Sequence, residues 1–86
     1  MPDYTFTENA FAEYLEWQRD KQTIKRINAL LKDIARSPFS GIGKPEPLKH
    51  GEPGRWSRRI NESDRIVYRV ADDAIIVLQC KGHYED

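Results

Sequence analysis

Residues 55–80 read RWSRRINESDRIVYRVADDAIIVLQC, and this stretch decides the fold class of the 86-residue chain. Three segments within it, 55–60, 65–70 and 74–80, alternate in the period-two pattern of a β-strand. Short polar connections at 62–64 and 71–73 predict that the three strands form an antiparallel meander. We expect an odd number of residues in each connection, because a one-residue slip inverts a strand and would mix polar with apolar side chains.

This register predicts one apolar and one cationic face of the sheet. The apolar face would hold Trp56, Ile60, Ile66, Tyr68, Val70, Ile76, Leu78 and Cys80, with Arg58 as its exception. The opposite face, open to water, would hold Ser57, Arg59, Arg65, Val67, Arg69, Val77, Gln79 and Lys81, followed by His83 if the last strand continues. Neither connection contains glycine, so we expect positive φ at Asp64 and Asp73, a conformation that Asp tolerates.

The first half of the chain predicts one short strand and two helices. Residues 4–6 alternate as a strand, and Thr7 is a suitable N-cap for a helix that ends near Gln18. Asp20 can cap a second helix, which Ser37-Pro38 would stop. The apolar residues at helical spacing are Phe11, Tyr14 and Leu15 in the first helix and Ile24, Ile27, Leu30, Leu31 and Ile34 in the second.

The order β-α-α-β-β-β predicts an α+β domain, in which an antiparallel two-helix hairpin packs on one face of an antiparallel sheet. With 38% hydrophobic and 33% charged residues, the chain can fill one small core, so we expect a single domain over residues 1–86. We expect no membrane segment and no signal peptide. Cys80 is the only cysteine, which excludes an internal disulfide and favours a cytoplasmic location.

Charge is segregated along the chain, although the formal net charge is zero. Residues 21–60 contain ten bases and three acids, whereas residues 1–20 and 61–86 are both acidic overall. A basic segment of this kind favours an anionic partner, most commonly a nucleic acid. Pairing between the acidic and basic elements of the same chain is the alternative. Residues 38–54 form a long loop rich in proline and glycine, and such loops are usually functional.

Four side chains fit the chemistry by which RNA is cleaved through its own 2′-hydroxyl. That reaction needs a base for the 2′ proton, a cation for the crowded phosphate and an acid for the 5′-oxygen. Glu46 is a candidate base, because the prolines on both sides stiffen its backbone. Arg59 and Arg65 carry planar guanidinium groups that match phosphate oxygens. His83 titrates near neutral pH and is a candidate acid.

Each of these residues also has a plainer interpretation. Glu46 would then be a solvated loop acid, Arg65 would form a surface ion pair with Glu62 or Asp64, and His83 would merely be exposed. The sequence contains no spaced His/Asp/Glu cluster, no Ser/His/Asp pattern and no P-loop. We therefore expect a reaction without a metal or any other cofactor.

Several segments make the chain resemble the YoeB/Txe-type toxins of the RelE superfamily, which are ribosome-dependent mRNA interferases of bacterial toxin–antitoxin systems. The most specific segments are GKPEPLKH at 43–50 and WSRRI at 56–60. The others are YLEWQ at 14–18, INALLKD at 27–33, SPF at 37–39, RIVY at 65–68, Cys80 and His83-Tyr84. The resemblance covers nearly the whole chain and implies a RelE-like, microbial RNase-like fold.

The resemblance also implies a role for each site residue. Glu46 resembles the family's general base, Arg65 its phosphate stabiliser and His83 its general acid. Tyr84 resembles the aromatic residue that supports the substrate and the acid, while Lys49 and Arg59 resemble further phosphate-contacting residues. One departure is the C-terminal Glu85-Asp86, which continues beyond the His-Tyr end of many relatives.

The function implied is that of a toxin of a type II system that cuts mRNA in the A site of the 30S ribosomal subunit and inhibits translation. The products would be a 2′,3′-cyclic phosphate or 3′-phosphate and a 5′-hydroxyl. The implied partners are the ribosome, mRNA and a YefM/Axe-like antitoxin, with a homodimer as a further assembly. Two alternatives stay open: a ParE-like toxin without nuclease activity, and a non-catalytic RNA- or protein-binding module of the same fold.

Overall fold

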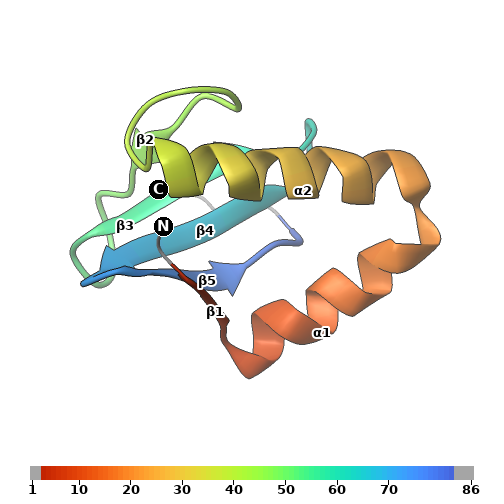
Figure 1. Cartoon of the computed structure of the whole chain (residues 1–86), viewed down its shortest axis with the longest axis horizontal. Helices are drawn as coiled ribbons and strands as arrows, with labels where there is room; N and C mark the ends of the chain where they lie inside the picture. Colours follow the sequence, from red (N-terminus) through yellow and green to blue (C-terminus); the bar gives the residue numbers. More distant parts are fainter. Residues whose placement is uncertain (1–2, 83–86) are drawn as a thin grey trace.

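In the computed structural model, which describes residues 3–82, two helices pack on a five-stranded sheet (Figure 1). The elements in chain order are β1 Asp3–Phe6, α1 Glu8–Glu16, the single 3₁₀ turn η1 Trp17–Arg19, α2 Lys21–Arg36, β2 Glu46–Pro47, β3 Arg55–Arg59, β4 Arg65–Ala71 and β5 Ala74–Gln79. The predicted α+β class is therefore confirmed. Within residues 3–82, no helix is long and apolar enough to cross a membrane.

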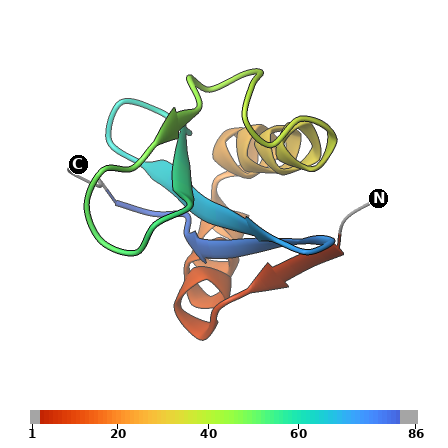
Figure 2. The ribbon, with the colours of Figure 1, turned by 90° about the vertical axis from the view of Figure 1, so that its left-hand side faces the viewer.

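The sheet is mixed, which corrects the prediction of a wholly antiparallel one. Its strand order is β1-β5-β4-β3-β2, and β1 runs parallel to β5, whereas all other neighbours are antiparallel. The pattern of a four-residue strand carries no information about its partner or direction. The two-residue β2 was also not predicted; Pro47 is tolerated there because β2 lies at the sheet edge opposite β1 (Figure 2).

The register between β3 and β4 has the predicted faces, but the register next to β5 was predicted wrongly. Trp56 lies opposite Tyr68 in the β3–β4 ladder, so the two side chains share one face, as predicted. The β4–β5 connection has only two residues, with positive φ at Asp72 rather than at Asp73 or Asp64. As a result, Ile75 and Val77 face the core instead of Ile76 and Leu78.

The physical reason for this error is that both alternations of β5 are apolar. Ile75 and Val77 occupy one face of the strand and Ile76 and Leu78 the other, so the pattern cannot choose between them. An irregularity in the ladder near Val67 and Tyr68 then shifts the register by one residue. This shift returns Cys80 to the core, where it was predicted to lie.

Side-chain caps set the starts of the two helices as predicted. The Thr7 hydroxyl oxygen accepts the Ala10 N–H at 3.1 Å, and the Asp20 carboxylate accepts the Thr23 N–H at 3.0 Å. The two helices diverge from their connection as an open V rather than a closely packed hairpin (Figure 1). The Tyr14 hydroxyl donates to Asn28 Oδ1 at 2.7 Å and so bridges the two arms.

The core fills the space between both helices and one face of the sheet. In α2 the predicted stripe is confirmed, because Ile27, Leu30 and Ile34 are fully buried. In α1 it was right for Tyr14, which packs against the core, but wrong for Phe11 and Leu15, which are about half exposed. Ala10 of α1 and Trp17 of the following η1 turn also face the core.

Candidate functional site

A buried arginine holds the loop that leads from α2 to Glu46. Arg58, the charged exception on the predicted apolar face, is 0% exposed, yet every side of its guanidinium group has a partner. It donates to Asp33 Oδ2 at 2.6 Å, to the carbonyl oxygens of Ser37, Ser40 and Ile42 at 2.7, 3.0 and 2.8 Å, and to the Tyr68 hydroxyl at 3.2 Å. These bonds fold residues 37–42 against the sheet.

The acidic member of this network serves the same loop. Asp33 Oδ2 also accepts the N–H of Ile42 at 3.1 Å. The hydrogen bond from Arg58 is the main reason why the pKa of the Asp33 carboxyl lies below its usual range. A side chain at Gly41 would collide with this carboxylate, so the loop needs glycine there.

The loop next joins the sheet edge and presents Glu46. The Arg59 N–H donates to the Gly43 carbonyl at 2.7 Å, and three residues later Glu46 lies opposite Ser57 in the β2–β3 ladder. Arg59 lies opposite Arg65 in the β3–β4 ladder, so Glu46, Arg59 and Arg65 share one face of the sheet. Directly paired residues project to the same side of a sheet.

Glu46 and Arg65 meet on this face. Arg65 Nη1 lies 4.0 Å from Glu46 Oε2, and the two side chains are 16% and 52% exposed. The solvent-exposed carboxylate of Glu46 therefore lies beside the Arg65 side chain, which is mostly buried. The alternative in which Arg65 pairs with Glu62 or Asp64 is not what the structure has, because the carboxylate beside Arg65 belongs to Glu46.

The other predicted phosphate-contacting residues differ in how closely they join this pair. Arg59 is exposed and directly opposite Arg65. Lys49 is exposed in the loop two residues after β2. Lys81 is not part of this face: its Nζ pairs with Glu16 Oε2 at 2.7 Å and lies 5.7 Å from the Trp17 ring centroid. The ion pair with Glu16 of α1 thus places the Lys81 amine away from Glu46 and Arg65.

The face was predicted to be open to water, and this is correct only in part. Ser57 and Val67 are each 1% exposed and Leu48 is 8% exposed. Leu48 is placed on the same face by the hydrogen bond from its N–H to the Arg55 carbonyl at 2.9 Å. The accessible part therefore lies around Glu46, Arg59 and Arg65, with a covered strip beside it.

The described chain ends next to Arg65, through contacts that the sequence did not reveal. The Arg65 N–H donates to the Gly82 carbonyl at 3.1 Å, and the Gly82 N–H donates to Asp64 Oδ1 at 2.7 Å. The only sequence feature that could have indicated a role for Asp64 is its position directly before Arg65. His83 and Tyr84 follow Gly82 in the sequence but lie outside the described residues.

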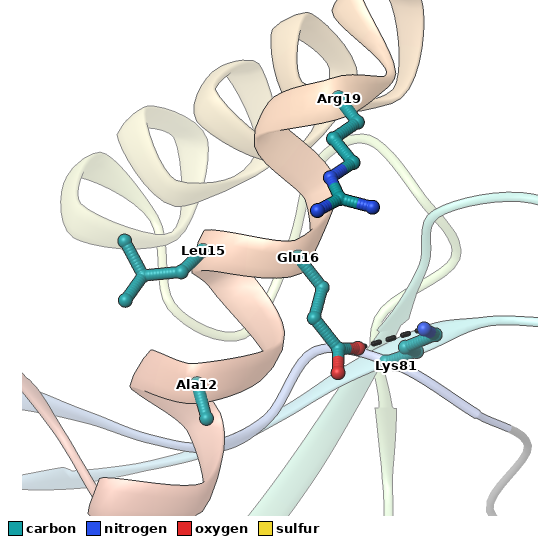
Figure 3. A pocket seen from close by; sticks show the side chains of 5 residues that line it. All are labelled: Ala12, Leu15, Glu16, Arg19 and Lys81. Atoms are coloured by element: carbon teal, nitrogen blue, oxygen red, sulfur yellow. Dashed lines mark hydrogen bonds and ion pairs between the residues drawn. The ribbon is translucent and has the colours of Figure 1, made fainter.

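A separate cavity of about 560 Å³ lies along α1 and shares no residue with the pair of Glu46 and Arg65 (Figure 3). In Figure 3 the Lys81 amine meets the Glu16 carboxylate, while Leu15 points away from them. Across residues 3–82, no group of three or more His, Cys, Asp or Glu side chains is arranged to hold a metal ion.

Comparison with known proteins gives consistent results. The family model described as a YoeB-like toxin of bacterial type II toxin-antitoxin systems matches residues 6–84. The toxin YoeB of Escherichia coli K12 is 51% identical over 80 residues, which cover 92% of this chain and 95% of that protein.

Two solved structures from Staphylococcus aureus have the same fold. A YoeB dimer superposes with a TM-score of 0.90 at 47% identity and covers 96% of this chain and 98% of its own. YoeB in a heterotetrameric YoeB-YefM toxin-antitoxin complex superposes with a TM-score of 0.88 at 46% identity and covers 98% and 99%.

Proposed function

The chain belongs to the YoeB-like toxins of bacterial type II toxin–antitoxin systems, and on that premise we propose that it is a ribosome-dependent endoribonuclease. Its substrate would be mRNA in the ribosomal A site, and the consequence would be arrest of translation. The observation that carries the proposal is the 4.0 Å approach of Glu46 Oε2 to Arg65 Nη1 on an accessible sheet face.

The proposed reaction uses the 2′-hydroxyl of the RNA as nucleophile. The Glu46 carboxylate takes the 2′ proton while the 2′-oxygen forms a bond to phosphorus. The bond from phosphorus to the 5′-oxygen breaks, and His83 gives its proton to that oxygen. The products are a 2′,3′-cyclic phosphate and a 5′-hydroxyl, and the cyclic phosphate can open to a 3′-phosphate.

The geometry of a nucleotide explains why the base and the cation must be neighbours. The 2′-hydroxyl and the oxygens of the adjacent phosphate are only a few bonds apart, so one nucleotide can touch Glu46 and Arg65 together. Arg65 would stabilise the charge that grows on the phosphate oxygens in the transition state. Arg59, Lys49 and Tyr84 are the proposed supporting residues.

The proposed partners follow from the relatives. The Staphylococcus aureus YoeB structures contain a dimer and a complex with YefM. We propose that this chain likewise binds a YefM-like antitoxin and can form a homodimer. An antitoxin that covers Glu46 and Arg65 would block the site directly.

The test is a ribosome-bound mRNA that carries one 2′-deoxy nucleotide at the mapped cut site. Cutting at that linkage should be abolished, because the nucleophile is missing, and end analysis of normal RNA should find a 5′-hydroxyl on the downstream fragment. The same mRNA without ribosomes is the matched control and should stay intact. Efficient cutting of the deoxy linkage, or a 5′-phosphate on the product, would refute the mechanism.

A further inference from the structure

Arg69 is a second cationic position on the sheet face that carries Glu46 and Arg65. It lies in β4 directly opposite Arg55 of β3, four residue pairs along the ladder from the pair Arg59 and Arg65. Its side chain is partly exposed, and it forms no hydrogen bond or ion pair with any residue in the described range 3–82. Arg69 therefore differs from Arg65, which has the Glu46 carboxylate nearby.

Arg69 and Arg55 place two like charges directly opposite each other in the β3–β4 ladder. Like charges directly opposite each other in a ladder are destabilising, because their Cβ atoms are only about 5 Å apart. Arg55 is tied down by its loop, since its guanidinium group donates to the carbonyl oxygens of His50 at 2.7 Å and Glu52 at 3.3 Å. Arg69 has no such partner among residues 3–82, so its guanidinium group is available to an anion.

The spacing of the two cationic positions suits one strand of nucleic acid. Arg65 and Arg69 are four residues apart on one strand, which is roughly 13 Å. This distance corresponds to about four stacked nucleotides, and to fewer in an extended chain. Guanidinium groups bind phosphate oxygens with two parallel hydrogen bonds.

We infer that Arg69, supported by Arg55, binds a phosphate of the same RNA strand about two to four nucleotides from the bond that is cut. The inference rests on the proposed function, and it adds a phosphate subsite to the catalytic pair. The RNA backbone would then run along β4 from Arg65 to Arg69, over the covered strip at Ser57 and Val67. Such a subsite fixes the position of the strand without reading its bases.

The test moves a single neutral methylphosphonate along a ribosome-bound mRNA, through five positions on each side of the cut. Single-turnover cleavage is measured for the wild type, Arg69→Gln, Arg69→Lys and Lys25→Gln. Lys25 is exposed on α2, so its variant controls for the loss of one positive charge elsewhere. We expect one methylphosphonate, a few nucleotides from the cut, to slow the wild type about tenfold, as the loss of one charged hydrogen bond would.

Arg69→Gln should cleave normal mRNA more slowly by the same factor, and the methylphosphonate at that position should not slow it further. Arg69→Lys should recover part of the rate, and Lys25→Gln should behave as wild type. A wild type that leaves normal mRNA uncut refutes the proposed function, and this inference with it.

Normal cutting by Arg69→Gln refutes the inference alone. The same holds if the variant is slowed equally at every methylphosphonate, which would indicate ribosomal RNA as the ligand. It also holds if cutting is normal but the complex with the antitoxin dissociates faster, which would assign Arg69 to an acidic protein segment.

Discussion

The charged pair of Arg58 and Asp33 is buried in a small protein. Its burial is tolerated because, among the described residues, the buried side-chain nitrogen and oxygen atoms all have hydrogen-bond partners. The ion pair measures 2.6 Å between Arg58 Nη1 and Asp33 Oδ2, with side chains 0% and 8% exposed. A buried pair of this kind adds little net stability compared with apolar residues, but removing one partner leaves a buried charge and is costly. The pair serves mainly to specify where the loop before Glu46 lies.

We therefore predict that Asp33→Asn lowers the free energy of unfolding by about 3 kcal/mol or more at pH 7. Urea unfolding measures the change. The pH dependence has a definite sign, because the pKa of Asp33 is lowered in the folded state by the hydrogen bond from Arg58. The stability from this group is fully present above the ordinary pKa of 3.8 and is lost as pH falls through the lowered value.

The difference between wild type and Asp33→Asn should accordingly shrink as pH is lowered from 5 toward 2. Asp72→Asn is the control, because Asp72 is exposed in the β4–β5 turn and Asn also tolerates its positive φ of 50°. A difference that stays constant over this pH range would contradict the assigned role of the Asp33 charge.

The register of β5 shows, at the scale of an element, what the sequence can and cannot specify. Where the faces differ in polarity, as in β3 and β4, alternation predicted the correct side for Trp56 and Tyr68. Where both faces are apolar, as in β5, the length of the turn determines which face is buried, and the sequence pattern does not predict it. The same limit applies to β1, whose parallel partner depends on the path of the whole chain.

Two adjacent isoleucines test this register. Ile75 is 0% exposed, whereas Ile76 is only partly buried. We predict that Ile75→Ala lowers the free energy of unfolding by about 2–5 kcal/mol and that Ile76→Ala costs clearly less. The chemical change is identical in the two variants, so each is the control for the other. Equal losses, or a larger loss for Ile76→Ala in urea unfolding, would support the rejected register.

Two hydrogen bonds at Gly82 join the segment after β5 to Asp64 and to Arg65 at the start of β4. We predict that Asp64→Ala lowers the protection of the Gly82 amide against hydrogen exchange at least tenfold, because the amide loses its acceptor, Asp64 Oδ1. Asp64→Asn should keep most of the protection, since the amide oxygen can still accept. Glu62→Ala, an exposed change in the same loop, should have no effect. Unchanged exchange in Asp64→Ala would show that the bond contributes nothing.

At the scale of the whole molecule, sequence analysis predicted the fold class and selected three candidate residues that lie together, but it did not predict the contacts that hold them in place. Glu46, Arg59 and Arg65 were chosen for their chemistry, and the structure places them on one sheet face. The contacts of Arg58 and Asp64 were not predicted, because they link residues far apart in the sequence and depend on loop conformations without a pattern. The chemical properties of a side chain can be read from the sequence, whereas contacts between distant residues can be seen only in the folded chain.

The molecule separates its stability from its proposed activity. The core and the buried pair of Arg58 and Asp33 lie on the helix-covered face, whereas Glu46 is 52% exposed at the opposite face. We predict that Glu46→Gln keeps the free energy of unfolding within about 0.5 kcal/mol of wild type, as surface substitutions usually do. The same variant should lose cleavage of ribosome-bound mRNA by about 10²- to 10⁴-fold, because the amide cannot accept the 2′ proton.

Single-turnover cleavage and urea unfolding of the same preparation make the comparison, with Glu52→Gln as control because Glu52 is an exposed loop acid outside the pair. Glu52→Gln should leave both quantities unchanged. Wild-type cleavage by Glu46→Gln would remove Glu46 from the role of base. Loss of cleavage together with a large loss of stability would instead show that Glu46 acts through the fold, since the two faces would then not be independent.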